Sequence, residues 1–206
     1  MIKTLFRDMW WVLLDITNFS QSKIIAEVYG MAEEEFKIKS DWDALFMQYE
    51  MGRILTKDLS EKLAKNLWKP ELNYFELVDK NIWKCCSINE KIYDFIVSLK
   101  WKYNQINLSD ISVAVKNALF KNGLYYIFDD LVLSCDTGFS KRNDLENQTT
   151  HFFDFALNKY WFKAEECLFI DDKQENLDIA KKTGMNTILF ENEEKTISTV
   201  KKFLDI

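Results

Sequence analysis

The chain has 206 residues, of which 48% are hydrophobic and 15% aromatic, a composition typical of a folded globular protein and not of a disordered one. Its formal net charge is -6, and the interspersed positive and negative side chains argue against a surface that binds nucleic acid. No apolar run is long enough to cross a membrane, and the N-terminus lacks the pattern of a secretion signal, so we expect a cytoplasmic protein without a membrane partner.

Cysteine and histidine usage excludes further classes of site. The four cysteines show neither a C-x-x-C spacing nor a grouping typical of metal ligands, which predicts reduced, structural thiols. His151 is the only histidine, so a zinc site rich in histidine is not expected.

The first part of the chain predicts a strand followed by a helical segment. Residues 2–6 are typical of a buried strand, and Asp8 follows it. Residues 17–89 show helical periodicity without a clear strand, which predicts a small helical bundle inserted between strands. Within it, Arg53 is a candidate contact for an anion, although a solvated arginine is the simpler interpretation.

The remainder of the chain alternates between strand and helix patterns. The expected strands are residues 103–108, 130–134, 167–170 and 186–190. The expected helices are residues 91–100, 111–122, 152–160 and 196–203, and one that follows the strand at 167–170 and ends at Lys182. Such alternation predicts right-handed parallel βαβ units. We therefore expect an α/β protein whose Rossmann-like parallel sheet core comprises residues 1–16 and 90–206, with residues 17–89 as a separate helical-bundle domain.

Two adjacent carboxylates, Asp171 and Asp172, follow the apolar run at residues 167–170. The carboxyl edge of a parallel sheet is where open α/β folds bind ligands. Neighbouring carboxylates repel each other unless a cation or proton lies between them, so a hard ion such as Mg²⁺ suits this pair. An aspartate that caps the following helix is the alternative. Asp8 also follows a buried strand, so the two carboxylate sites could converge.

The order of these residues resembles the haloacid dehalogenase-like (HAD) hydrolase superfamily. Asp8 follows the first strand, Ser109 the second, Lys141 lies in a loop, and the acidic pair follows a later strand. Residues 133–141, with the sequence LSCDTGFSK, look like the loop that precedes the lysine of that family. Residues 169–176, followed by Ala180 and residues 184–187, are similar to its fourth motif. The predicted helical bundle stands where the family has its cap domain.

The resemblance implies a Mg²⁺-dependent phosphatase of a small phosphorylated metabolite. In that family an aspartate, here Asp8, attacks the phosphoryl group and forms an aspartyl-phosphate that water then hydrolyses. Lys141 and Ser109 would assist as catalytic residues, since a weak carboxylate nucleophile needs its repulsion from the phosphate relieved by fixed donors and cations. Ser109, Asp110 and Lys141 would bind the substrate.

The resemblance also implies a metal site. The Mg²⁺ ligands would be Asp8, the backbone carbonyl of Trp10, Asp171 and Asp172. We expect a monomer or a homodimer.

The first motif departs from the family pattern. Trp10 stands where the phosphatases carry a second aspartate, Trp11 where the family has glycine, and Arg7 where it has an apolar residue; Arg7 would need a partner and could pair with Asp8. Arg142 stands where a proline usually follows the lysine. Two alternatives therefore remain: a catalytically impaired relative that binds a phosphorylated ligand or a protein partner, and a metal-independent 2-haloacid dehalogenase.

Overall fold

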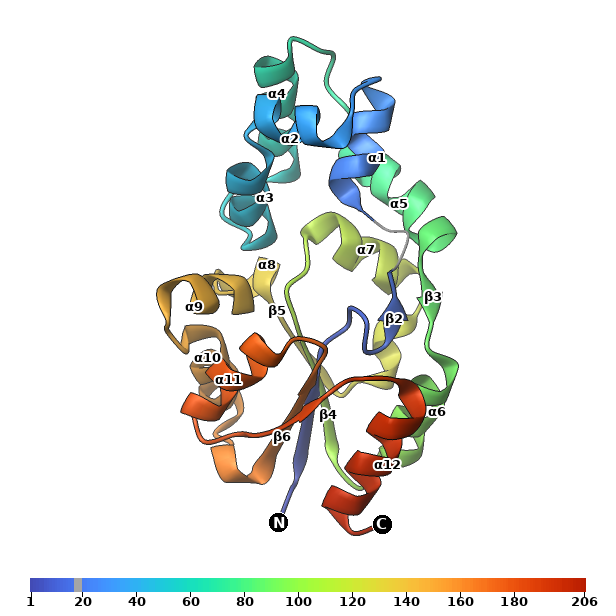
Figure 1. Cartoon of the computed structure of the whole chain (residues 1–206), viewed down its shortest axis with the longest axis vertical. Helices are drawn as coiled ribbons and strands as arrows, with labels where there is room; N and C mark the ends of the chain where they lie inside the picture. The colour runs from blue at the N-terminus through green and yellow to red at the C-terminus, as the bar shows by residue number, and fades with distance from the viewer. Residues whose placement is uncertain (17–19) are drawn as a thin grey trace.

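The protein, described here by a computed structural model, is built around a central five-stranded sheet (Figure 1). The structure describes residues 1–16 and 20–206. The strand order is β5-β4-β1-β6-β7, and all four pairings are parallel. The strands are β1 (Thr4–Arg7), β4 (Asn104–Ser109), β5 (Asp130–Leu133), β6 (Cys167–Asp171) and β7 (Asn186–Leu189). This arrangement confirms the predicted Rossmann-like α/β fold.

Apolar residues on both faces of the strands fix this sheet between two helical layers. On one face, Leu5, Leu168 and Ile170 pack in a core with helices α6 (Glu90–Leu99), α7 (Val113–Lys121) and α12 (Glu193–Leu204). On the other face, Phe6 and Phe169 pack against α10 (His151–Tyr160) and α11 (Gln174–Lys182). Burial on both faces explains why β6 has four consecutive apolar residues and why β1 has apolar side chains at both of its central positions, Leu5 and Phe6.

Short helical elements complete the connections of this core. They are the 3₁₀ turns at Leu124–Ile127 and Ala164–Glu166, α8 (Ser134–Thr137) and α9 (Lys141–Asn147). Sequence analysis placed Lys141 in a loop, and this was wrong, because Lys141 is the first residue of α9. The Ser140 hydroxyl accepts a hydrogen bond from the Asn143 backbone N–H at 3.0 Å and caps the helix.

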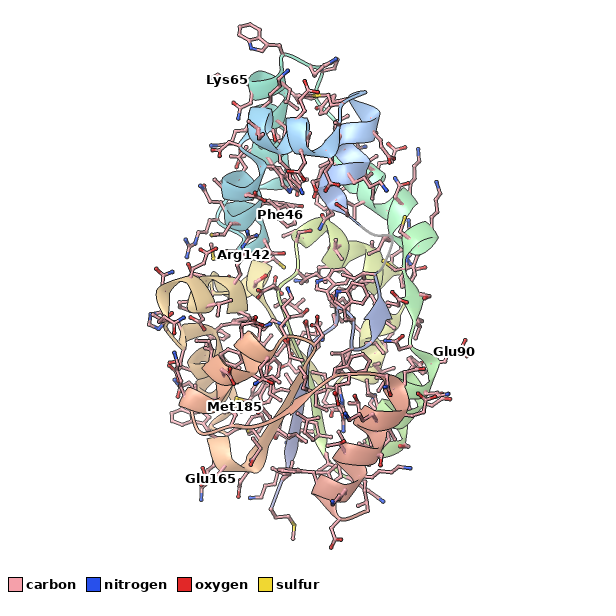
Figure 2. The ribbon with its side chains drawn as sticks, in the orientation of Figure 1. Phe46, Lys65, Glu90, Arg142, Glu165 and Met185 are labelled. Carbon is pink, nitrogen blue, oxygen red and sulfur yellow. The ribbon has the colours of Figure 1, made fainter. Side chains whose placement is uncertain are left out.

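Five helices between β2 (Leu14–Asp15) and β3 (Ser87–Ile88) lie beyond the carboxyl edge of the sheet (Figure 1). These insert helices are α1 (Gln21–Val28), α2 (Glu33–Ser40), α3 (Trp42–Glu50), α4 (Thr56–Leu67) and α5 (Tyr74–Cys85). The predicted start of this segment at residue 17 lies outside the described residues. In Figure 2, Phe46 of α3 and Arg142 of α9 lie near the junction between the insert helices and the sheet layer.

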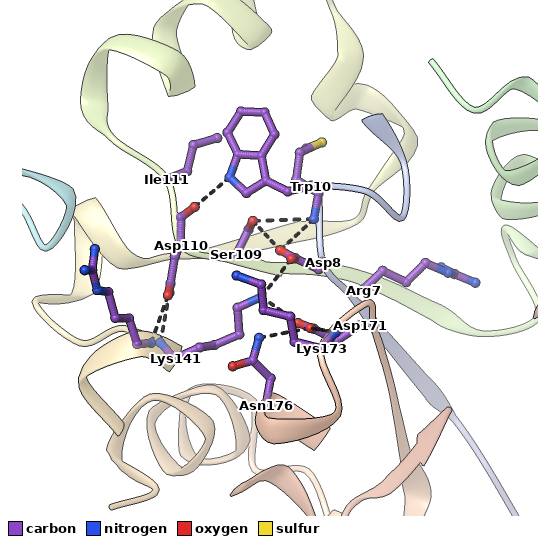
Figure 3. Close-up of polar contacts among 12 residues, drawn as sticks. Arg7, Asp8, Trp10, Ser109, Asp110, Ile111, Lys141, Asp171, Lys173 and Asn176 are labelled. Atoms are coloured by element: carbon purple, nitrogen blue, oxygen red, sulfur yellow. Dashed lines mark hydrogen bonds and ion pairs between the residues drawn. The ribbon is translucent and has the colours of Figure 1, made fainter. Parts of the chain in front are cut away.

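Arg7 is buried in the central strand, with 1% of its surface exposed. Its Nη1 donates a hydrogen bond to Gln105 Oε1 on the neighbouring strand, whereas its Nη2 has no partner among the described residues. Burial lowers the pKa of Arg7 to about 9. Figure 3 shows its side chain extending away from Asp8, and no ion pair joins the two in the described chain, so Arg7 does not neutralise that carboxylate.

Among the described residues, no helix has both the length and the apolar character needed to span a membrane.

Candidate active site

The predicted site residues meet where the strand order reverses. Asp8 follows β1, and Asp171 ends β6, which pairs with β1. Ser109 ends β4 on the other side of β1. After β1, the chain builds β4 and β5 on one side and then crosses to β6 and β7 on the other, so β1 and β6 flank the topological switch point. Ligands of open α/β sheets bind at such a point.

Lys141 connects the two carboxylate sites (Figure 3). Its Nζ lies 2.9 Å from Asp8 Oδ2 and 2.7 Å from Asp171 Oδ2. Only 4% of its surface is exposed, so these charges interact in a region with little water. Burial alone would lower the pKa of Lys141, but Asp171 and Asp8 outweigh it and raise that pKa. The lysine is therefore a fixed positive charge beside Asp8.

Asp8 is held in one orientation by three donors. Its Oδ1 accepts hydrogen bonds from the Ser109 hydroxyl at 2.5 Å and from the Met9 backbone N–H at 2.8 Å, and its Oδ2 faces Lys141. Burial raises the pKa of Asp8 to about 7, with Lys141 acting against that rise and Asp171 adding to it. The structure thus brings together Asp8, Ser109 and Lys141, the three residues that the order of the sequence motifs singled out.

The two adjacent aspartates have different surroundings: Asp171 is buried and hydrogen-bonded, whereas Asp172 faces the cavity. Asp171 is fully buried, and its Oδ1 accepts hydrogen bonds from Lys173 N–H and from Asn176 Nδ2, both at 2.9 Å. The N-cap of α11 is Lys173, so neither aspartate caps that helix as the alternative interpretation required. Asp172 is half-buried and faces the cavity, and burial together with Asp171 raises its pKa.

Three of these carboxylates could hold a cation. One oxygen each from Asp8, Asp171 and Asp172 lies within 4.8 Å of the others. In the part of the chain that the structure describes, Lys141 is the one cation paired with these three carboxylates, so the group retains excess negative charge. Carboxylate oxygens in this arrangement suit Mg²⁺.

Asp110 has a structural task beside the site. Its Oδ1 and Oδ2 accept hydrogen bonds from the backbone N–H groups of Lys141 and Arg142 at 2.9 and 3.0 Å, which ties the end of β4 to the start of α9. Its backbone carbonyl accepts a hydrogen bond from Trp10 Nε1 at 2.9 Å. The Asp110 carboxylate therefore positions the lysine that faces Asp8.

A cavity of about 320 Å³ opens beside Asp8. The sheet edge contributes Asp8, Asp110, Lys141 and Asp172 to its lining, and the insert helices contribute Glu50. Trp10 and Trp11 line it as well. Trp11 has a φ of 59°, which explains why a glycine suits this position.

Sequence analysis missed Glu50. It is the last residue of α3, and no strand end or paired carboxylate marks it in the sequence. The one available signal was Gly52, two residues later, which has a φ of 66°. A Cβ there would lie 2.2 Å from the Cys135 carbonyl oxygen, so this turn packs directly on the core. Arg53, a candidate anion contact, donates from Nη2 to the Gly138 carbonyl at 3.2 Å instead.

Comparisons with solved structures identify the fold. The chain is similar to a predicted HAD-like family hydrolase from Porphyromonas gingivalis, with 24% identity, a TM-score of 0.78, and coverage of 100% of this chain and 99% of that chain. It is also similar to a HAD family enzyme from Bacteroides thetaiotaomicron, solved in complex with magnesium and inorganic phosphate, with 19% identity, a TM-score of 0.75, and coverage of 92% and 94%.

A HAD phosphatase from Thermococcus onnurineus matches with 15% identity and a TM-score of 0.65, over 98% of each chain. No family model matches this sequence, and no curated protein does.

Proposed function

Because the chain has the fold of the HAD-like hydrolases, we propose that it is a Mg²⁺-dependent phosphatase that acts on a small phosphorylated metabolite. The observation that carries this proposal is the geometry around Asp8. A carboxylate held by Ser109 and Met9, with a lysine 2.9 Å from its second oxygen, faces a cavity whose lining includes charged side chains, at the switch point of the sheet. A nucleophile for an anionic group needs this kind of environment.

In the proposed reaction, Asp8 attacks the phosphorus atom of the substrate. The bond from phosphorus to the leaving oxygen breaks, and an aspartyl-phosphate forms on Asp8. Water then attacks this phosphoryl group, which regenerates the Asp8 carboxylate and releases inorganic phosphate. Lys141 compensates the negative charge beside Asp8 in both steps, and the Ser109 hydroxyl donates to a phosphate oxygen when substrate displaces part of its bond to Asp8.

The proposed ligands of Mg²⁺ are Asp8, Asp171, Asp172 and the Trp10 carbonyl. The three carboxylates fit a divalent cation because their oxygens lie within 4.8 Å of one another and their charge exceeds that of Lys141. When bound, the ion supplies positive charge that offsets the repulsion between Asp8 and the phosphoryl group.

We assign the insert helices, within the predicted domain of residues 17–89, the role of a cap. They lie beyond the carboxyl edge of the sheet and place Glu50 in the lining of the cavity (Figure 1). A cap over this edge excludes water from the reacting groups and selects the substrate.

The test of this function is hydrolysis of p-nitrophenyl phosphate by the purified protein, with Mg²⁺ and with EDTA. We expect turnover that requires the metal. Turnover of a 2-haloacid with no metal requirement would favour the dehalogenase alternative. Binding of inorganic phosphate without turnover of any phosphate ester would favour the catalytically impaired alternative, for which the indoles of Trp10 and Trp11 in the cavity are the supporting observation.

Metal binding can be tested apart from activity. We expect Mg²⁺ to raise the melting temperature of the protein, since a ligand present at 100 times its dissociation constant stabilises the folded state by about 2.7 kcal/mol. The Asp172→Asn variant should lose most of this shift, because a neutral amide replaces a cavity-facing ligand. Asp178→Asn, on the exposed face of α11, is the control and should keep it. An undiminished shift in Asp172→Asn would place the metal elsewhere.

A further inference from the structure

The proposed reaction needs a proton donor for the leaving oxygen, and the residues that first suggest themselves are already engaged. Lys141 is paired with Asp8 and Asp171, and both oxygens of Asp110 accept backbone N–H groups. Trp10, whose indole N–H is bonded to the Asp110 carbonyl, has no acidic proton to give. His151 lies on α10 with its ring against Phe139, and it is not among the residues that line the cavity.

Of the four carboxyl groups that line the cavity, Asp8 is the proposed nucleophile, Asp172 a proposed metal ligand and Asp110 is bound to backbone N–H groups, which leaves Glu50. In residues 1–16 and 20–206, no side-chain hydrogen bond or ion pair engages it, although it lines the same cavity as Asp8. Contacts of the backbone at residues 50–52 hold Glu50 in place. The Glu50 carbonyl accepts a hydrogen bond from Ser134 Oγ at 2.7 Å, and Gly52 packs against the Cys135 carbonyl. The carboxyl is thus anchored to the sheet layer while its oxygens stay available.

We propose that Glu50 is the general acid and base of this phosphatase, an inference that rests on the function proposed above. As Asp8 attacks phosphorus, the electron pair of the breaking P–O bond goes to the leaving oxygen, which takes the proton of the Glu50 carboxyl and departs as an alcohol. In the second step the Glu50 carboxylate takes a proton from water, the resulting hydroxide oxygen bonds to phosphorus, and the bond to Asp8 breaks. Glu50 is then protonated again.

The electrostatic setting of Glu50 supports the acid role. Burial raises its pKa to about 8, and Asp110 adds to this, while Arg142, Lys141 and Lys173 act against it. Its place at the carboxyl end of α3, where helix carbonyls point, also disfavours the charged form. The group therefore carries a proton at neutral pH, as a general acid must.

The experiment compares Glu50→Gln with the unaltered protein on two substrates. Glycerol phosphate releases a basic alkoxide that needs a proton, whereas p-nitrophenyl phosphate releases a stable phenolate. We expect Glu50→Gln to lower kcat/KM by about 10²-fold or more for glycerol phosphate and by far less for p-nitrophenyl phosphate. For the unaltered protein, kcat/KM on glycerol phosphate should fall as the pH rises through about 8, and the variant should lack that fall. Glu61→Gln, on an exposed face of α4, is the control.

The outcomes separate the two proposals. Equal losses on both substrates, or no loss on either, would overturn the role of Glu50 while the phosphatase function stands. If the unaltered protein hydrolyses neither substrate, both proposals fail.

A second and independent observation concerns the tryptophans. Four of the seven have a positive φ, between 54° and 73°: Trp11, Trp68, Trp101 and Trp161. All five glycines of the chain also have a positive φ. A positive φ occurs at only a few per cent of residues other than glycine and is a genuine outlier for a bulky side chain, so among seven tryptophans roughly none is expected.

The positions and the exposure of these tryptophans are also unusual for this residue type. Trp68 and Trp161 stand at the left-handed ends of α4 and α10, and Trp101 follows the end of α6, positions where helices favour glycine. Their side chains are 94%, 92% and 97% exposed, although tryptophan is one of the more buried residue types. Trp42, by contrast, is 4% exposed and stacks on Phe46 with 4.7 Å between ring centroids.

We infer that the natural chain carries glycine at positions 11, 68, 101 and 161. The UGA codon is read as tryptophan in some genetic codes and as glycine in others, so translation of the gene in the wrong code would produce this pattern. The chain has only 5 glycines in 206 residues, about a third of the usual frequency. With glycine at position 11, the turn after Asp8, which borders the cavity, loses the strain of a left-handed bulky residue.

Three measurements test this inference. The gene should have UGA at these four positions and UGG at Trp42. Tryptic peptides of the protein isolated from its natural host should contain glycine there.

The fourfold Trp→Gly variant should melt about 5 °C or more above the chain with tryptophan, because each left-handed bulky residue is strained. Trp→Ala at the three exposed positions should not reproduce the gain, since alanine retains a Cβ, and Trp42→Gly should lower the melting temperature. Tryptophan in the native peptides, or equal gains from alanine and glycine, would overturn the inference.

Discussion

Asp8→Asn should abolish phosphatase activity, with kcat lower by about 10⁴-fold or more, as is usual when a catalytic nucleophile is removed. The amide has the shape of the carboxylate but is too weak a nucleophile to form the phosphoryl intermediate. The fold should survive. Lys141 keeps its second partner, Asp171, at 2.7 Å. The variant loses the ion pair between Lys141 and Asp8, but it also no longer has to bury the Asp8 carboxylate, whose pKa burial raises to about 7, and the two effects on stability offset each other. We expect the melting temperature to change by no more than about 3 °C.

The measurement is hydrolysis of p-nitrophenyl phosphate at saturating Mg²⁺, with circular dichroism melts of the same samples. Asp178→Asn, whose native carboxylate is in a surface ion pair with Lys181 on α11, is the matched control and should keep full activity. An Asp8→Asn protein that turns over at the normal rate would remove Asp8 from the role of nucleophile and end the proposed mechanism.

Part of the sheet was predictable because β5 and β6 contain short apolar runs that end at polar residues. Cys167 to Ile170 can only be buried on both faces, and the aspartates that follow must then lie at the carboxyl edge. The same reasoning located Asp8 and Ser109, because parallel strands bring residues at their ends to one edge whatever their separation in sequence. Most of the site residues that could be predicted from the sequence therefore lie at strand ends.

Residues that are brought to the site by tertiary packing are not marked in the sequence in this way. Glu50 enters the cavity because the turn after α3 packs on α8, where Gly52 meets the Cys135 carbonyl and Ser134 donates a hydrogen bond to the Glu50 carbonyl. This contact joins segments that are 84 residues apart. Lys141 was identified, but its place at the start of α9 depends on Asp110, whose carboxylate holds the first two N–H groups of that helix. Local periodicity does not encode such partners.

Lys141→Met should destabilise the protein more than any surface substitution, by about 3 to 5 kcal/mol, because it leaves Asp8 and Asp171 buried without their cation. Methionine is unbranched and only one heavy atom shorter than lysine, so most of the loss reports the charge and not a cavity. Urea unfolding in EDTA measures it. Lys159→Met, which removes an exposed ion pair with Asp130, is the control and should cost less than about 1 kcal/mol.

The same unfolding experiment is repeated with Mg²⁺ in place of EDTA. If Asp8, Asp171 and Asp172 bind the ion, Mg²⁺ should restore part of the stability lost in Lys141→Met, since it supplies positive charge to the same carboxylates. Activity should stay low in that condition, because the metal does not replace the ammonium group 2.9 Å from Asp8 Oδ2. Equal stability of Lys141→Met and the unaltered protein in EDTA would show that the lysine is not the counter-ion of the buried aspartates. A loss that Mg²⁺ leaves unchanged would instead contradict the metal site, because the cation and the lysine would then act on different groups.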